Sequence, residues 1–345
     1  MILIEPKVSI IITNVFNTIY LIRCLESISN IDYTNYEVIV VDCLTQNIKE
    51  DLKEFSDVVI VHFDHDIGPA MQHNIGIEYS DKESKYVAFL DNDTIVDINW
   101  LKNAIDLMKI DSNIGIVGCK ICDLENKKMI QCLRPICDIY GFTYNECVGM
   151  IDNGQFESSS ERFAVSACSM ICRKDLLEIV EGFDSKFFIF VDDIDICWRS
   201  QLIGFKVVEN PKAIVYHKGG GTKDGGYLKE SRITTTGKRI YYRERNTLRM
   251  LLKNYEVMTL VKILPIYFTI SFAEVVVLIF IGRIDLIENY LQAVKWNIAN
   301  IKDTCAERIK INKLRKMNDK ILIKKLIHYS LKIRIFKDFG VPNIR

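Results

Sequence analysis

Two carboxylates stand one residue apart directly after an apolar run of the chain. Residues 86–90 read Tyr-Val-Ala-Phe-Leu, and Asp91, Asn92 and Asp93 follow at once. Alternate side chains of a strand share one face, and a turn at the end of the strand can bring both carboxylates toward one point. Convergent carboxylates repel unless a cation lies between them, and a divalent ion with oxygen ligands is the usual partner. Taken alone, the triplet favours a plain turn of solvated Asp residues over a metal site, but other motifs accompany it.

A second acidic cluster follows the apolar stretch at residues 187–191. Asp192, Asp193 and Asp195 lie within four positions. A hydrophobic setting raises the pKa of a carboxyl group and makes it a candidate general base. If a helix begins here, the same acids are also favoured as N-caps. Both interpretations stay open for Asp192 and Asp195 taken singly, whereas capping does not account for the apolar run before them.

A histidine closes a later strand-like run. Residues 213–216 read Ala-Ile-Val-Tyr, and His217 follows just before a glycine-rich segment that begins at Gly219. A single histidine is more often structural than a ligand, but its position at a strand end makes a metal ligand equally reasonable. The glycines at 219–221 and 225–226 predict a mobile loop of the kind that can close as a lid.

These side chains need a scaffold that brings them together, and the first half of the chain predicts one. Runs rich in Val and Ile are typical of strands buried on both faces, and helical periodicity separates them. The strands are expected at residues 7–13, 37–42, 58–61 and 86–90, with helices at 19–28, 69–79 and 100–108. Such βαβ units predict a doubly wound, mostly parallel α/β sheet. Ligands bind beyond the carboxyl ends of its strands, where Thr13, Asn14, Asp42 and Asp91 all fall.

The composition is that of a globular protein with a large core. The chain has 345 residues, of which 49% are hydrophobic and 26% are charged. Lys and Arg balance Asp and Glu at 45 each, so the overall charge offers no argument for a nucleic-acid partner. The 11 cysteines are scattered, and the one CxxC, at 119–122, has no second pair at zinc-finger distance. Without a signal-peptide pattern at the start, reduced thiols in a cytosolic protein are expected.

Six ordered motifs resemble those of one known family. They are VSIIITNVFN from Val8, VVD ending at Asp42, Asp66-x-Gly68 with Asn74-Ile75-Gly76, FLDND ending at Asp93, GFDSKFFIFVDDIDICWR at 182–199, and VYHKGGGT from Val215. Over residues 7–252 the chain is similar to family 2 glycosyltransferases with the GT-A fold, above all to rhamnosyltransferase-like members from bacteria and archaea. One motif alone would be weak support, whereas six in this order and spacing are specific.

The resemblance implies a nucleotide pocket. Asp42 would accept a hydrogen bond from the imide N–H of the base, and other matching residues would line the pocket. These are Thr13, Asn14, Asn17, Asp66, Gly68, Asn74, Asp91 and Asn92.

The resemblance also implies the reaction chemistry. Asp91 and Asp93 match the DxD motif, which holds Mn²⁺ or Mg²⁺ on the diphosphate of the donor, and His217 matches a position that joins the metal in some members. Asp193 matches the general base that deprotonates the acceptor hydroxyl, and direct displacement then inverts the anomeric carbon.

Two positions depart from the family pattern. The family usually has Glu before the base, whereas this chain has Asp192, so Asp192 and Asp193 could exchange roles. The family often has Arg before the Asn of its third motif, whereas this chain has His73. Loss of the Arg removes a fixed donor from the nucleotide pocket, which leaves the base and the sugar open.

The last third of the chain is expected to be helical. Residues 258–282 are almost wholly apolar, and the 19 residues 263–281 carry one charge, Glu274. That length is near the lower limit for spanning a bilayer, and a central acid costs roughly 2.5–3.5 kcal/mol on insertion. A buried helix, a helix lying on the membrane surface and a true span all stay open. The tail at 301–345 has 13 Lys or Arg against four acids, which favours contact with an anionic leaflet.

The sequence therefore predicts a GT-A catalytic domain at 1–245 and a helical region at 246–345. The expected enzyme is an inverting, metal-dependent hexosyl- or deoxyhexosyltransferase of polysaccharide biosynthesis. Its donor would be a UDP-, dTDP- or GDP-linked sugar, and its acceptor a glycan or lipid-linked glycan. We expect a cytoplasmic protein, peripheral on the inner face of the cell membrane, without a nucleic-acid partner. A homodimer is one option for its oligomeric state.

Two other functions compete with this one. A nucleotidyltransferase also combines an α/β sheet with acidic metal ligands, but it usually has a glycine-rich, basic phosphate loop after the first strand. The corresponding loop here is Asn14-Val15-Phe16-Asn17, with neither a glycine nor a basic residue. A non-catalytic module would bind the donor or a glycan without turnover, which the intact acidic motifs disfavour.

Overall fold

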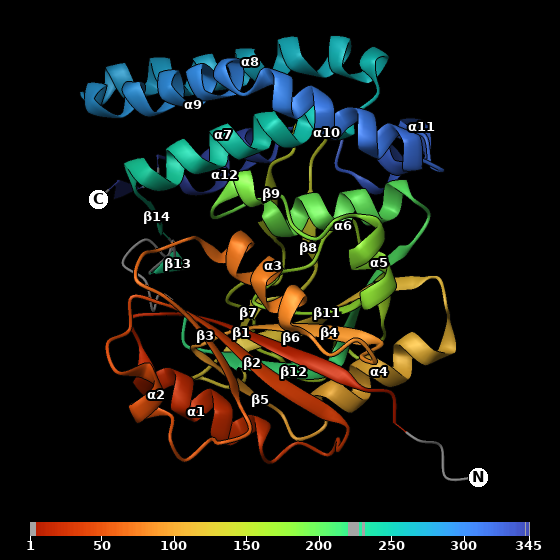
Figure 1. The fold of residues 1–345 in the computed structure, drawn as a ribbon. Helices are drawn as coiled ribbons and strands as arrows, with labels where there is room; N and C mark the ends of the chain where they lie inside the picture. Colours follow the sequence, from red (N-terminus) through yellow and green to blue (C-terminus); the bar gives the residue numbers. More distant parts are fainter. Residues whose placement is uncertain (1–4, 220–227, 230–231, 342, 345) are drawn as a thin grey trace. The chain divides into compact units, whose positions relative to one another are not determined.

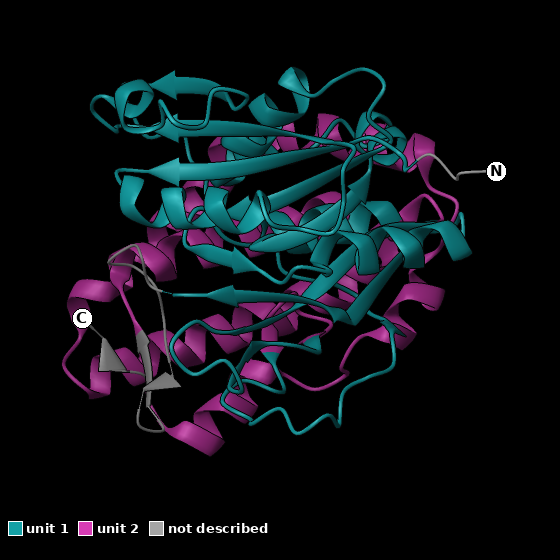
Figure 2. Ribbon diagram, turned by 90° about the horizontal axis from the view of Figure 1, so that it is seen from below, with its two compact units in different colours: residues 1–135, 145–200, 205–219 teal, residues 136–144, 201–204, 220–345 magenta. Residues whose placement is uncertain are grey.

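The chain divides into two compact units in a computed structural model that describes residues 5–219, 228–229, 232–341 and 343–344. The first unit comprises Met1–Pro135, Asn145–Ser200 and Phe205–Gly219, and the second comprises Ile136–Tyr144, Gln201–Gly204 and Gly220–Arg345 (Figure 2). The predicted division at residue 245 falls inside helix α7 (Gly237–Asn254), which lies in the second unit. Apart from Gly219, the expected glycine lid lies outside the described residues.

The first unit is built on one large sheet (Figure 1). Its strand order is β10-β12-β6-β11-β4-β1-β2-β3, with β5 paired to β12 and β7 paired to β6. The bounds are β1 (Val8–Val15), β2 (Tyr36–Cys43), β3 (Val59–Phe63), β4 (Tyr86–Asp91), β5 (Thr94–Val96), β6 (Ile114–Asp123), β7 (Ile130–Cys132), β10 (Ser160–Glu161), β11 (Ser169–Arg173) and β12 (Lys206–His217). The four strands predicted from the apolar runs are β1 to β4.

The apolar runs form strands because the sheet is buried on both faces. Along β1, Ile10 and Ile12 join the cluster formed with α1 (Thr18–Ile28) and α4 (Trp100–Ile110). Ile11 points to the other face, where α3 (Pro69–Tyr79) packs. Figure 1 shows α1 and α4 on one side of the sheet and α3 on the other. The α/β fold class is as predicted.

The sheet is mixed rather than mostly parallel. Strands β4, β1, β2 and β3 are parallel, as the βαβ pattern predicts. Strand β11 runs antiparallel to both β4 and β6, and β5 and β10 are antiparallel to β12. No helical crossover of the βαβ type precedes β11 in the described chain, since residues 124–168 form short strands and loops. A parallel strand needs such a crossover. The prediction of a mostly parallel sheet was therefore wrong for the part of the chain in which the helical periodicity stops.

The remaining elements of the chain are short in the first unit and helical in the second. The first unit also contains α2 (Ile48–Asp51), α5 (Lys174–Ile179), 3₁₀ helix η1 (Ser185–Phe187) and the start of α6 (Asp192–Leu202). Strands β8 (Pro135–Cys137) and β9 (Thr143–Asn145) pair with each other. The second unit contains β13 (Leu228–Lys229), β14 (Arg232–Thr235), α7, α8 (Val257–Phe280), η2 (Ile284–Leu286), α9 (Ile287–Ala299), α10 (Ile301–Leu314), α11 (Asp319–Leu322), η3 (Ile323–Lys325), α12 (Leu331–Phe339) and β15 (Asn343–Ile344).

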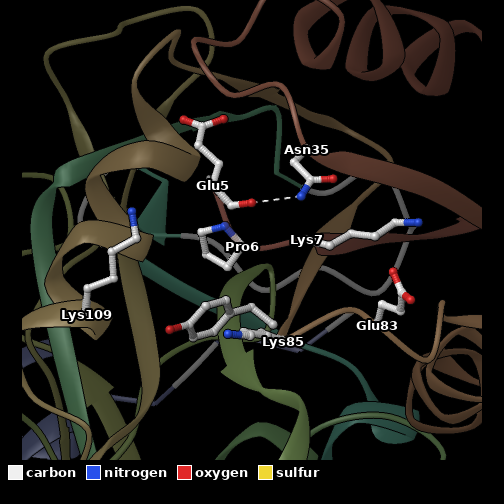
Figure 3. Close-up of a pocket in the computed structure, with 8 residues that line it drawn as sticks. Glu5, Pro6, Lys7, Asn35, Glu83, Lys85 and Lys109 are labelled. Atoms are coloured by element: carbon white, nitrogen blue, oxygen red, sulfur yellow. Dashed lines mark hydrogen bonds between the residues drawn. The ribbon is translucent and has the colours of Figure 1, made fainter. Parts of the chain in front are cut away.

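A surface hollow lies where strands β1, β2 and β4 begin (Figure 3). Its lining includes Lys7, Asn35, Lys85 and Lys109. This is the amino-terminal edge of the parallel strands, opposite to the edge that carries Asp91. Because ligands of such sheets bind at the carboxyl edge, we place the candidate site at the other end of the strands.

Helix α3 approaches β1 through Gly76. A Cβ atom at this position would lie 2.3 Å from Cγ2 of Ile11. We therefore expect Gly76→Ala to lower the free energy of unfolding by about 1–3 kcal/mol through overpacking. Urea denaturation followed by circular dichroism measures this. Glu78→Ala, at an exposed position of the same helix, should change stability by no more than about 0.5 kcal/mol. Equal effects of the two variants would contradict the packing argument.

Candidate active site

The sheet register brings four of the predicted residues to one edge. Thr13 pairs with Asp91 across β1 and β4, and Asn14 pairs with Asp42 across β1 and β2. The Thr13 hydroxyl donates to Asp91 Oδ1 at 3.5 Å. Residues that are far apart in the sequence are thus neighbours because parallel strands end together.

An acidic cluster with a histidine occupies this edge. Strand β5 follows the Asp91–Asp93 turn and pairs with β12, so that Thr94 lies opposite His217. The Nε2 atom of His217 lies 3.1 Å from Oδ1 of Asp93, and the Lys218 N–H donates to the Asp93 carbonyl at 3.0 Å. The pairing of β5 with β12 therefore brings the strand-end histidine close to the two carboxylates.

The cluster carries unfavourable electrostatics in the absence of a cation. Burial, and then the charge of Asp93, raises the pKa of the Asp91 carboxyl. Burial acts to lower the pKa of His217, but its hydrogen bond to Asp93 and the charges of both aspartates outweigh this and raise it. A divalent cation relieves both effects, because it neutralises the carboxylates and takes the place of the Nε2 proton. The donor set of two carboxylates and an imidazole fits such an ion.

Gln131 on β7 orients the histidine. Its Oε1 atom lies 2.9 Å from Nδ1 of His217 and can only accept, so Nδ1 carries the proton. Its Nε2 atom donates to Asp123 Oδ2 and to the His217 carbonyl, both at 2.9 Å. With Nδ1–H fixed in this way, a lone pair of the neutral ring is directed at the carboxylates. No sequence motif points to Gln131, since β7 lies in a stretch without clear periodicity.

A second network surrounds Asp42, whose side chain is fully buried. Its Oδ1 atom accepts from the Thr45 hydroxyl at 2.6 Å and from the Asn14 amide, and its Oδ2 atom lies 2.7 Å from Nδ1 of His62. The Asn92 amide donates to the Asn14 side chain. Three predicted pocket residues therefore form one hydrogen-bonded group, together with Thr45 and His62, which the sequence analysis did not single out.

Three other predicted pocket residues have structural hydrogen bonds. The Asn17 side chain caps α1 by accepting the Tyr20 N–H at 3.2 Å, and Asp66 accepts the Gly68 N–H at 2.9 Å. Asn74 exchanges two 2.8 Å hydrogen bonds with the backbone of Phe183. The Asn74 amide thus holds the turn before η1, and its contact with a nucleotide stays a prediction.

His73 belongs to the core and not to a polar pocket. It is 1% exposed, and its ring lies 4.9 Å from that of Phe89 and 4.6 Å from that of Phe183. Burial lowers its pKa to about 3, so the ring is neutral at physiological pH. This residue therefore does not replace the cationic Arg of the family pattern.

The second acidic motif follows a strained loop. Phe188, Phe190 and Val191 have φ values of 63°, 67° and 71°, which are uncommon for residues with a side chain. Gly68, with φ of 77°, approaches this loop so closely that a Cβ atom there would lie 2.6 Å from the Phe188 carbonyl oxygen. The loop ends where α6 begins at Asp192.

The three acids of this motif have different environments. Asp195 is fully buried and forms a 2.7 Å ion pair with Arg199, which also donates to the Val180 carbonyl. Asp192 is 6% exposed, and burial and then the charge of Asp193 raise its pKa well above the usual range. Asp193 is more exposed and accepts the Ile194 N–H at 2.8 Å. Asp195 is therefore structural, which leaves the neighbouring pair as the candidate bases.

Comparison with known proteins gives the family. The model of glycosyl transferase family 2 matches residues 9–180. The chain belongs to this family, as its motifs indicated.

Proteins similar to this chain include several glycosyltransferases. The chain is 26% identical over 270 residues to the dTDP-rhamnosyl transferase RfbF of Shigella flexneri, covering 77% of this chain and 87% of that protein. It is 27% identical over 165 residues to the pre-mycofactocin glycosyltransferase of Mycobacterium tuberculosis, covering 47% of this chain but only 32% of that protein. In fold it is similar to the mannosyltransferase PcManGT of Pyrobaculum calidifontis in complex with GDP-Man and Mn²⁺ (TM-score 0.51, 13% identity, 90% and 86% of the two chains).

The role of Gln131 predicts an effect on metal binding. We expect Gln131→Leu to weaken Mn²⁺ binding by about 10- to 100-fold, because His217 loses the acceptor that fixes its ring. Isothermal titration of the purified protein with Mn²⁺ measures the affinity. Gln292→Leu, at an exposed position of α9, serves as the control and should leave it unchanged. An unaltered affinity in Gln131→Leu would show that the ring needs no such support.

Proposed function

We propose that this protein transfers a sugar from a nucleotide-sugar donor, with a divalent cation, to an acceptor hydroxyl with inversion at the anomeric carbon. The observation that carries the proposal is the position of His217 at the carboxyl edge of the sheet, where its ring lies 3.1 Å from Asp93 Oδ1 and has a ligand atom within 4.8 Å of one of Asp91. Membership of glycosyl transferase family 2 supports the reaction class. Similarity to RfbF over most of both chains supports a dTDP-linked deoxyhexose as the first donor to test.

Different residues would act on the leaving group and on the nucleophile. A cation held by Asp91, Asp93 and His217 would act as a Lewis acid on the departing diphosphate. Gln131 keeps the histidine ring oriented for this role. Asp42, Asn14 and their neighbours offer a preformed polar wall for the nucleotide.

We propose Asp193 as the base that takes the proton of the acceptor hydroxyl. Asp193 is the more exposed of the pair, so an acceptor can reach it. Asp192 is buried, and its raised pKa favours the protonated form, which cannot accept a proton. The negative charge of Asp193 contributes to that raised pKa, so replacing Asp193 should also lower the pKa of Asp192. Assignment of the base to Asp193 agrees with the family motif.

The decisive assay follows nucleotide diphosphate release from a panel of UDP-, dTDP- and GDP-sugars, with Mn²⁺ or Mg²⁺ and membrane lipid extract as acceptor. We expect release with one donor, and its loss on addition of EDTA. Asp93→Ala should abolish release by weakening metal binding. Asp193→Asn should lower release by about 10²- to 10⁴-fold, because general-base catalysis is lost, while donor affinity stays within a few-fold.

Asp106→Asn provides a matched control on the surface of α4 and should leave release unchanged. Donor binding without release from any donor would favour a non-catalytic binding module. Release of pyrophosphate instead of a nucleoside diphosphate would favour a nucleotidyltransferase.

We also propose that helix α8 of the second unit lies on an anionic membrane surface. The helix has 24 residues, and by length and composition it could cross a membrane. One of its faces packs within the unit through Ile263, Tyr267, Ile270 and Leu278. The opposite face exposes large apolar side chains to solvent, namely Met258, Val261, Ile266, Phe268, Phe272, Ile279 and Phe280.

Polar contacts on the packed face favour a surface position over a span. The Lys332 ammonium bridges Glu274 and Glu244, at 2.5 Å from each, and the Tyr267 hydroxyl donates to Glu244 at 3.0 Å. These bonds satisfy the central acid of α8 inside the protein. A spanning helix would have to leave them, whereas a surface helix keeps them and buries only its apolar face.

The charge of this region supports an anionic lipid as the partner. Residues 237–345 hold 22 of the 45 Lys and Arg residues but only nine of the 45 Asp and Glu residues. Each basic group near an anionic leaflet contributes about 1 kcal/mol. The same region therefore offers both an apolar face and the charge that anionic headgroups attract.

We expect the protein to sediment with vesicles that contain phosphatidylglycerol and to bind phosphatidylcholine vesicles more weakly. The double variant Phe272→Ser/Phe280→Ser should lose most of this binding, since these side chains are 68% and 85% exposed. Ile110→Ser, 82% exposed on α4, is the control and should bind as the natural protein does. A concentration-dependent dimer without vesicle binding would instead identify the face as an interface between two copies.

A further inference from the structure

The thiol of Cys168 lies within the acidic cluster. Ligand atoms of Asp91, Cys168 and His217 all lie within 4.8 Å of one another. Cys168 directly precedes β11, which pairs antiparallel with β4. The carbonyl of Cys168 accepts the Asp91 N–H at 3.2 Å. The backbone of the sheet therefore fixes the position of the thiol beside the carboxylate. No sequence motif pointed to this residue, because it reaches the cluster only through the antiparallel pairing of β11.

The three side chains make a donor set of a different kind from that of the DxD pair. Asp91 offers a carboxylate oxygen, His217 an imidazole nitrogen and Cys168 a sulfur. Mg²⁺ and Mn²⁺ prefer oxygen ligands, whereas a thiolate selects softer or borderline ions such as Zn²⁺ and Co²⁺. A tetrahedral zinc site takes bonds of about 2.0–2.3 Å, so its ligand atoms lie somewhat closer together than the upper limit observed here.

The charges around the thiol agree with a cation site. Asp91 belongs to the donor set, and Oδ1 of Asp93 lies 3.1 Å from Nε2 of His217. These carboxylates attract a dication, and a thiol that coordinates the dication loses its proton.

We propose that Asp91, Cys168 and His217 bind Zn²⁺ or a similar thiophilic divalent ion. The Cys168 S–H bond breaks, a metal–sulfur bond forms, and the proton passes to the buffer without any change of oxidation state. This ion uses Asp91 and His217, which the transfer reaction needs for its own cation. Zn²⁺ is therefore a competitive inhibitor with respect to Mn²⁺ or Mg²⁺. That last consequence rests on the proposed function, whereas the binding site does not.

Co²⁺ provides a direct test, since a thiolate bound to Co²⁺ gives an intense ligand-to-metal charge-transfer band in the near ultraviolet. We expect the full-length protein to show this band on titration with Co²⁺, and Cys168→Ser to lack it. Competition with a chromophoric chelator should show Zn²⁺ affinity reduced at least 10-fold in Cys168→Ser, with Mn²⁺ affinity changed less than threefold. Cys305→Ser, at the exposed thiol of α10, is the matched control and should keep the band.

The outcomes separate this proposal from the proposed function. A band that persists in Cys168→Ser, or unchanged Zn²⁺ affinity in that variant, would overturn the site. Cys168→Ala provides a second variant if the serine protein does not fold, as judged by circular dichroism. Mn²⁺-dependent nucleotide release is measured on the same preparations. The natural protein could also release no nucleotide from any donor while its band is lost in Cys168→Ser. That result would support the zinc site and contradict the transferase proposal.

Discussion

The close approach of like charges at the end of β4 is the interaction on which the rest of the site depends. The sheet holds Asp91 and Asp93 beside His217, and burial denies them the water that would screen their repulsion. Backbone pairing of β4 with β1 and β11, and of β5 with β12, supplies the rigidity that this arrangement requires. The antiparallel strands that make the sheet mixed are therefore the ones that complete the cluster.

The parts of the structure that the sequence predicted are those with a local pattern. The runs that became β1, β2 and β4 are continuous apolar segments, as is typical of strands buried on both faces. Parallel strands end at one edge of a sheet, so the sequence alone predicted that Thr13, Asp42 and Asp91 lie close together. The two acidic motifs and His217 lie at the ends of predicted strands or helices. Such ends are where ligands of α/β sheets bind, so the position of these residues indicated a functional site.

The residues that escaped prediction are brought in by pairing between distant segments. Gln131 lies on the short strand β7, in a stretch without periodicity, and Cys168 lies in the turn just before β11. Their partners, His217 and Asp91, lie 86 and 77 positions away in the sequence. Asn74 has a role that its motif did not reveal, because its side chain holds the backbone of Phe183, while its contact with a nucleotide stays a prediction. Residue type and spacing do not reveal which of two nearby polar groups a side chain will bond.

The loop before Asp192 has a consequence for evolution. Left-handed backbone at Phe188, Phe190 and Val191 costs of order 1–3 kcal/mol at each position, and glycine would adopt it without that cost. Selection for thermal stability alone would therefore enrich glycine at these three positions. The aromatic and branched side chains found there restrict the loop to fewer conformations than glycine would. With these side chains the chain gives up folding free energy and restricts the backbone that leads into its acidic pair.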